Sequence, residues 1–344
     1  MKSQTGSTLI EVVIAAAVML LVTSGIFAIL DRGLGNSALW NESSDLQQRA
    51  RVAADTLTSE LQAAGAGVPD GPLLRFLPAV EPKRRGSGAS INAVTIRYVP
   101  DNAPWSSLTA DLTPVTSSAA IATHSGCRSG TSACGFGTGS EVVVFDAAGN
   151  WDLASVQSIG PATLELANVA GPRSSSYGIG ARIAQVVETT LFLDVAERQL
   201  RREQPGSGAL PVIDNVVDFQ LSYFGNPLPP TEPVPPLGVA NCVFTSSGDV
   251  IPGPIVAADH GGLASLPLSM FTDGPYCGTG AGAYDVDLLR IRTIRAVLRL
   301  QAGVDTLRGL DPRLFARPGS ATTRQRMIPD AIVTFDISPR NLQR

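Results

Sequence analysis

The pattern of apolar and polar positions first divides the chain near its N-terminal end. Residues 1–8 are mostly polar, and the stretch from Leu9 to Leu30 that follows is apolar, with Glu11 as its single charged residue. At about 1.5 Å per residue, a helix over this stretch can cross a hydrocarbon core of about 30 Å. We therefore predict a membrane-spanning helix over residues 7–30.

A helical pattern with one apolar face continues beyond that stretch. Its apolar positions stand three, four or seven residues apart, and they are Leu39, Leu46, Ala50, Ala53, Leu57, Leu61 and Ala64. On the polar face, Asp45 and Arg49 stand four positions apart and are predicted to pair. Because glycine and proline follow at residues 65–69, the pattern predicts an amphipathic extension of the helix over residues 31–65.

After residue 65 the pattern changes to short β-branched runs separated by glycine, proline, serine and asparagine, which is typical of antiparallel β structure. Strands are predicted over Val94–Tyr98, Val142–Phe145, Thr163–Leu166, Ile183–Val187, Leu191–Leu193, Val216–Tyr223, Ile291–Leu300 and Ile332–Ile337. The stretch 66–344 is long enough to bury a core of its own. The predicted fold class is therefore α+β, with a long N-terminal helix followed by a large antiparallel β-rich domain.

A proline-rich segment interrupts the predicted domain at residues 225–238. Its prolines are Pro227, Pro229, Pro230, Pro233, Pro235 and Pro236. Proline lacks the backbone donor that a central strand needs, so this segment is predicted to be an extended surface loop. A polyproline stretch that binds a partner is the alternative.

Four cysteines, Cys127, Cys134, Cys242 and Cys277, all follow the predicted membrane helix. An even number in an exported domain predicts two disulfides. The order along the chain favours Cys127–Cys134 and Cys242–Cys277, although three pairings are formally possible. A four-cysteine metal site is the alternative, but the chain has no Cys-x-x-Cys pair, and we predict no metal and no cofactor.

Catalytic motifs are absent from the sequence. The two histidines, His124 and His260, stand among glycine and small polar residues, where a solvated side chain is the usual outcome. Asp273, Asp285 and Asp287 flank a glycine-rich stretch, where clustered carboxylates could bind calcium. Their spacing is not that of an EF-hand loop, so calcium is the alternative to a solvated acidic loop. We therefore predict that the chain is not an enzyme.

The balance of charge also bears on partners. A formal net charge of -4 argues against a generally basic surface for nucleic acid, and no nucleic-acid partner is predicted. Four arginines do gather in one segment, and they are Arg290, Arg292, Arg295 and Arg299. We predict that they are strand residues that flank the core and pair with carboxylates, and not a DNA site.

Glu11 is the least expected residue of the apolar stretch. A charged side chain at membrane depth costs about 2.5–3.5 kcal/mol, so Glu11 requires a partner. A secretory signal peptide would have several basic residues before a shorter apolar core and a small-residue cleavage site after it. The chain instead has one basic residue, Lys2, and its polar-to-apolar junction at Gly6 precedes the apolar core.

The segment Gly6-Ser-Thr-Leu-Ile-Glu11 resembles the leader of type IV prepilins and pseudopilins, which is cut after a glycine on the cytoplasmic face while the apolar helix is kept. The resemblance implies that residues 1–6 are a leader peptide and that cleavage between Gly6 and Ser7 yields an N-methylated Ser7. It also implies that Glu11 neutralises the N-terminal amine of an adjacent subunit, a buried pair. An ordinary membrane anchor in which Glu11 reaches the interface is the alternative.

Four further stretches narrow the resemblance. Residues 45–65, 212–223, 288–300 and 332–341 are similar to the W-type minor pilins and J-type minor pseudopilins, the PilW family. This resemblance implies a pilin-like fold and a minor subunit that initiates or caps a type IV pilus. A minor pseudopilin of a type II secretion system, or an adhesin or hydrolase tethered by a pilin-like anchor, is the alternative.

The same resemblance implies the partners and the location of the chain. The partners are a prepilin peptidase that also methylates the new N-terminus, other minor pilins or pseudopilins, the major pilin, the assembly platform and the lipid of the inner membrane. The chain is expected to cross the inner membrane once, with a cytoplasmic N-terminus and a periplasmic β-rich domain.

Overall fold

The computed structural model describes residues 9–67, 78–83, 92–124, 127, 132–146, 150–168, 176–205, 207–228, 244–251, 255–273, 286–322 and 327–342. The chain divides into two compact units. The first joins Met1–Arg51 with Leu300–Ala331, and the second joins Val52–Arg299 with Ile332–Arg344. The division falls inside the long helix, before the predicted boundary at residue 65.

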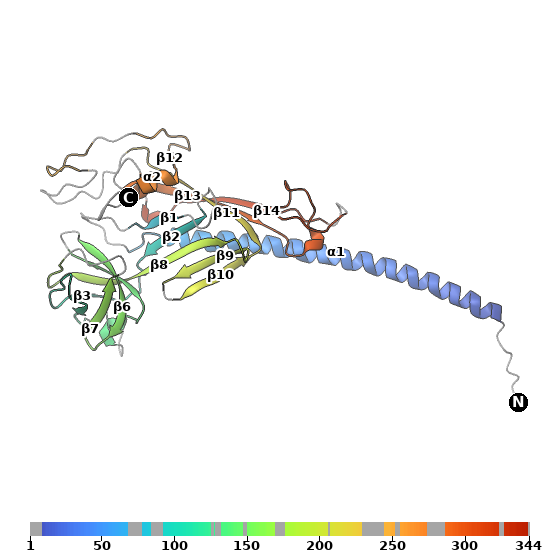
Figure 1. Ribbon diagram of the computed structural model, residues 1–344, viewed down its shortest axis with the longest axis horizontal. Coiled ribbons are helices and arrows are strands. Elements are labelled where there is room, and N and C mark those ends of the chain that lie inside the picture. Colours follow the sequence, from blue (N-terminus) through green and yellow to red (C-terminus); the bar gives the residue numbers. More distant parts are fainter. Residues whose placement is uncertain are drawn as a thin grey trace, which may run out of the picture. The chain divides into compact units, whose positions relative to one another are not determined.

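The helix α1 runs without interruption from Leu9 to Ala63 (Figure 1). The predicted apolar face is confirmed, because five of its positions are buried and Leu39 and Ala50 are partly buried. The five are Leu46, Ala53, Leu57, Leu61 and Ala64. The amphipathic part of α1 therefore forms a packing surface, as its spacing of three and four residues requires.

Two glycines end α1 and join it to the β structure of the second unit. Gly65 and Gly67 both have positive φ, which side chains rarely adopt. Gly65 N donates to Arg97 O at 2.9 Å, and Val99 N donates to Ala66 O at 2.7 Å. A Cβ on Gly67 would lie 2.5 Å from Val99 O, so only glycine allows the backbones to approach this closely.

In the first unit, the segment Leu300–Ala331 forms a compact loop with a core of its own. Leu307, Phe315 and Ile328 are buried there. Ile328 N donates to Leu307 O at 2.8 Å, which closes the loop. A Cβ on Gly309 would lie 2.9 Å from Cε2 of Phe315, so the ring requires glycine at this position.

The second unit contains a ten-stranded sheet. Its strands are β1 (Val80–Lys83), β2 (Ala93–Tyr98), β3 (Trp105–Ser107), β4 (Ser118–Ala120), β5 (Glu141–Phe145), β6 (Trp151–Ile159), β7 (Thr163–Asn168), β8 (Arg182–Asp194), β9 (Gln199–Gln204) and β10 (Gly208–Asp214). The main path is β1-β2-β8-β5-β6-β7-β4, while β3 and β9 pair with β8 and β10 pairs with β9. Every one of these pairings is antiparallel.

The long strand β8 changes neighbours halfway along its 13 residues. Its first half pairs with β5 and β3, and its second half pairs with β2 and β9. Side chains alternate across β5, because Val142 and Val144 belong to one core cluster and Val143 to another. The sheet is thus buried on both faces around β5.

A four-stranded sheet completes the second unit, in the order β12 (Ala264–Leu266), β11 (Val216–Gly225), β13 (Ile291–Leu300) and β14 (Ala331–Ile337). The short helix α2 (Leu268–Asp273) packs beside it, with the rings of Tyr223 and Phe271 in edge contact at 5.6 Å. Other short helical turns are η1 (Ser132–Gly135), η2 (Val286–Arg290), η3 (Asp305–Leu307) and η5 (Arg340–Leu342).

All the predicted strands are confirmed, with two of them merged into β8. The α+β fold class is likewise confirmed at the level of an N-terminal apolar helix followed by antiparallel β structure. The strands that were not predicted from the sequence are β1, β3, β4, β6, β9, β10 and β12. Residues 229–238 of the predicted proline-rich loop lie outside the described residues.

Candidate functional site

The first part of α1, Leu9–Leu30, is long and apolar enough to cross a membrane. It has 22 residues, and none of its apolar window is buried within the chain; a signal sequence would pass the same test. Its two hydroxyl groups bond back to the helix, from Thr23 Oγ1 to Met19 O at 2.7 Å and from Ser24 Oγ to Leu21 O at 2.9 Å. These bonds satisfy polar groups that lipid could not.

Glu11 lies in the first turn of α1 and is exposed. A carboxylate is favourable there, because the N-terminal end of a helix carries a partial positive charge. The predicted cleavage residues, Gly6 and Ser7, lie outside the described residues. Glu11 is therefore the one predicted processing or assembly residue that lies within the described part of the chain, and it stands at the start of the exposed apolar helix.

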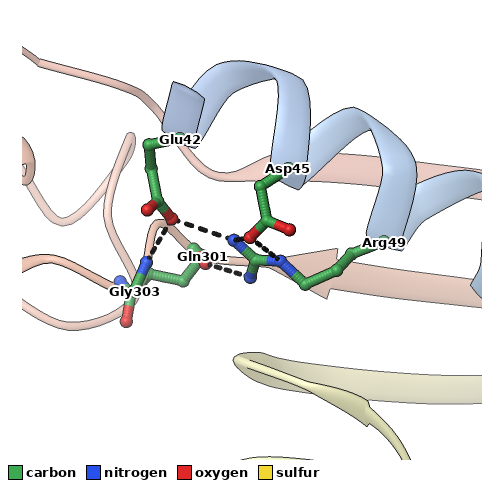
Figure 2. Close-up of polar contacts among 5 residues, drawn as sticks. All are labelled: Glu42, Asp45, Arg49, Gln301 and Gly303. Carbon is green, nitrogen blue, oxygen red and sulfur yellow. Dashed lines mark hydrogen bonds and ion pairs between the residues drawn. The ribbon is translucent and has the colours of Figure 1, made fainter. Parts of the chain in front are cut away.

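A cluster of polar contacts joins α1 to the loop of the first unit (Figure 2). Arg49 Nη2 meets Glu42 Oε1 at 2.9 Å, and Arg49 Nε donates to Asp45 Oδ2 at 2.8 Å, which confirms the predicted Asp45–Arg49 pair. Arg49 Nη1 donates to Gln301 O at 3.0 Å, and Gly303 N donates to Glu42 Oε1 at 2.6 Å. One guanidinium thus links two turns of the helix to the loop.

The predicted disulfide Cys127–Cys134 is confirmed. Cys242 and Cys277, the other predicted pair, lie outside the described residues. Ligand atoms of His124, Cys127 and Cys134 all lie within 4.8 Å of one another. The disulfide uses both thiols, so these three residues do not form a metal site in this state.

The ring of His124 makes two contacts with Trp105. Its ring lies 4.1 Å from that of Trp105, and His124 Nε2 donates to Trp105 O at 2.8 Å. The ring is thereby held against the start of β3, which is a structural role.

Asp287, one of the three aspartates of the possible calcium site, is not available as a ligand. Asp287 is fully buried, and its Oδ1 meets Arg290 Nη1 at 3.0 Å. Arg290 also donates from Nε to Asn226 O at 2.8 Å and from Nη2 to Pro227 O at 3.1 Å. Because the carboxylate of Asp287 pairs with the guanidinium of Arg290 in the core, it has a structural role and is not a calcium ligand.

Three of the four arginines, Arg292, Arg295 and Arg299, lie on β13 as predicted, whereas Arg290 is the last residue of η2. Arg295 donates from Nε and Nη2 to the two carboxylate oxygens of Asp336 at 2.7 and 2.9 Å. This contact lowers the pKa of Asp336 below its usual value. Arg292 instead donates from Nη1 to Leu289 O at 2.7 Å. Of these arginines, Arg290 and Arg295 therefore confirm the predicted pairing with carboxylates.

His260 belongs to the same exposed group as Arg295. Its ring stacks on that of Phe224 at 4.1 Å, and its Nε2 accepts a hydrogen bond from Arg295 Nη2 at 3.2 Å. The side chain is 35% exposed, so it is partly solvated as expected for a loop histidine, and in addition it stacks on Phe224.

A buried carboxyl that the sequence did not reveal lies on β5. Glu141 is 8% exposed, and its Oε2 has no hydrogen-bond partner among the described residues. Burial and then the neighbouring Glu188 raise the pKa of Glu141 to about 7, although Arg97 acts in the opposite direction. Arg97 is already engaged, since its Nε meets Glu188 at 2.7 Å and its Nη2 meets Glu81 at 2.9 Å.

Comparisons with models of known protein families and with curated proteins find no match for this chain. The structure shows an antiparallel β-rich protein whose N-terminal helix is apolar enough to cross a membrane.

Proposed function

We propose that this chain is a minor subunit of a type IV pilus, processed between Gly6 and Ser7 and held in the inner membrane by the apolar part of α1. The β-rich structure then lies in the periplasm. The main support is the leader-like segment that leads directly into α1, an uninterrupted helix that is exposed and apolar at one end and buried at the other.

The proposed mechanism is assembly rather than catalysis. Cleavage by a prepilin peptidase frees the amine of Ser7, which the same enzyme methylates. The apolar helix stores the subunit in the bilayer until it packs against helices of other minor pilins and the major pilin on the assembly platform. Glu11 then sets the register, because its carboxylate neutralises the amine of the adjacent subunit where neither charge could remain alone.

Processing gives the first test. In wild-type cells, mass spectrometry of the mature chain should find Ser7 as a methylated N-terminus. Gly6→Ala should leave the leader attached, because the peptidase requires a glycine before the cut. Ser3→Ala, in the same leader, should be cleaved normally. An intact Met1 terminus in the wild-type chain would contradict the proposal.

Assembly gives the second test. Glu11→Ala should be inserted and cleaved, but the loss of one partner from a desolvated pair costs about 3–5 kcal/mol. Co-purification with the other minor subunits should therefore fall sharply at equal membrane abundance. Val12→Ala, the neighbouring exposed position, should retain them.

The phenotype separates the pilus from its alternatives. A loss of surface pili in Glu11→Ala cells supports the proposal, whereas a loss of exoprotein release with intact pili supports a type II secretion pseudopilus. Unchanged partner recovery with normal pili and secretion would mean that the helix is only an anchor.

A further inference from the structure

Strand β14 is an edge of the four-stranded sheet, since β13 is its one neighbour among the described strands. A free edge offers a row of backbone donors and acceptors to any other strand, so proteins usually protect such edges. The usual means are proline, lysine, a bulge or a very short strand.

The other edge strands are all protected. β1 contains Pro82 and Lys83. β10 contains Pro211, and its register with β9 shifts between Pro211 and Ile213. The remaining edges, β3, β4 and β12, have only three residues each.

β14 lacks the proline, the lysine and the shortness that protect those edges. It is seven residues long, Ala-Ile-Val-Thr-Phe-Asp-Ile, and it contains no proline, glycine or lysine. Five of its seven residues are β-branched or aromatic and have high β-propensity. Ile332 is 64% exposed, while Val333 and Phe335 on the other face are only partly buried. Its single charge, Asp336, is neutralised by Arg295 of β13.

We propose that β14 is an interface at which two copies of this chain pair, edge to edge and antiparallel, about a twofold axis at Thr334. The two four-stranded sheets then form one continuous sheet. This inference goes beyond the proposed pilus function and does not depend on it.

The sequence of β14 is complementary to itself in this register. Thr334 lies opposite its own copy, and Val333 lies opposite Phe335 of the second copy. Pairs of an aromatic and a β-branched residue stabilise antiparallel strands. Covering these two half-buried side chains also removes apolar surface from water.

Charge does not oppose this pairing. Asp336 lies opposite Ile332 of the second copy, so the two Asp336 carboxylates are four positions apart along the strands. At about 3.4 Å per residue this is about 14 Å, which exceeds the screening length of about 8 Å at physiological salt. Each carboxylate also keeps its own Arg295. A second copy is therefore an occupant that the edge itself specifies.

The oligomeric state of the full chain in detergent tests the proposal. Light scattering over a range of concentrations should find a dimer for the wild-type chain. Thr334→Lys places two ammonium groups opposite each other and should weaken the dimer at least about tenfold, with unchanged circular dichroism. Val115→Lys, at a turn residue that is 93% exposed, should dimerise like the wild-type chain.

A cross-link tests the register. Oxidised Thr334→Cys should yield a covalent dimer whose linked peptide joins residue 334 to residue 334, identified by mass spectrometry. Ile332→Cys alone should not, because its opposite residue is Asp336. A wild-type chain that is monomeric at every concentration, or a Thr334→Lys chain that dimerises as tightly as the wild type, would overturn the proposal.

Discussion

Glu141 is a residue whose burial links stability to pH. Its pKa is raised from 4.5 to about 7 by burial and by Glu188. Between these two values the folded chain holds a proton that the unfolded chain has already lost. The free energy of unfolding therefore falls as pH rises from about 4.5 to about 7, and the cost persists above pH 7.

Glu141→Gln should remove this pH dependence. The neutral amide should make the chain more stable than the wild type above pH 7, by about 1–2 kcal/mol after allowance for solvent screening. Below pH 4.5 the two should be alike, because wild-type Glu141 is then protonated in both states. Denaturant unfolding from pH 4 to 8 measures the difference. Glu197→Gln, at an exposed turn, is the matched control, and an equal slope in all three chains would contradict the account.

Among the elements, α1 and the loop Leu300–Ala331 depend on each other through Arg49. The side chain of Arg49 is 13% exposed and bonds two carboxylates and the carbonyl of Gln301. Hydrogen bonds that involve a charged group contribute about 1.5–3 kcal/mol each when they are desolvated, and less where solvent reaches them. The loop should therefore open more readily when this guanidinium is removed.

Arg49→Ala should raise hydrogen exchange in residues 300–322 by about tenfold or more, since local opening has its own free energy. The amides of β2 and β8, in the other compact unit, should exchange as before. Mass spectrometry of the exchanged full chain measures both regions together. Arg51→Ala, an exposed arginine half a turn away, should leave the loop protected; equal exchange in the two variants would argue against the role of Arg49.

An element is predictable when its own residues show the burial pattern of a strand or a helix. β13 is predicted with its full bounds because, over most of its length, buried apolar residues alternate with less buried ones, three of which are arginines. The strand β9 is missed because its sequence, Gln-Leu-Arg-Arg-Glu-Gln, is almost entirely polar and charged, and its neighbours β8 and β10 supply its pairing. Glu188, Thr189 and Thr190 separate the two predicted strands, yet Glu188 bonds Arg97 and Thr190 bonds Thr95, so β8 continues through them.

At the scale of the whole molecule, the division into units was not predictable. Arg49 and Gln301 are 252 positions apart, and an arginine bonded to a backbone carbonyl leaves no mark on either local sequence. The same holds for Glu141, because only the structure brings it beside Glu188. The helix and its apolar face were predictable, since both follow from spacing within one segment.

The position of β8 also constrains the order in which the chain can fold. Thr95 on β2 and Thr190 on β8 meet across 95 positions of sequence, so β2 has no such neighbour until β8 has been synthesised. Contacts this distant form slowly, because loop-closure entropy is lost before pairing energy is gained. Until then β2 can pair only with β1, its other neighbour, and at roughly 5–20 residues per second the synthesis of the intervening chain takes about 5–20 s.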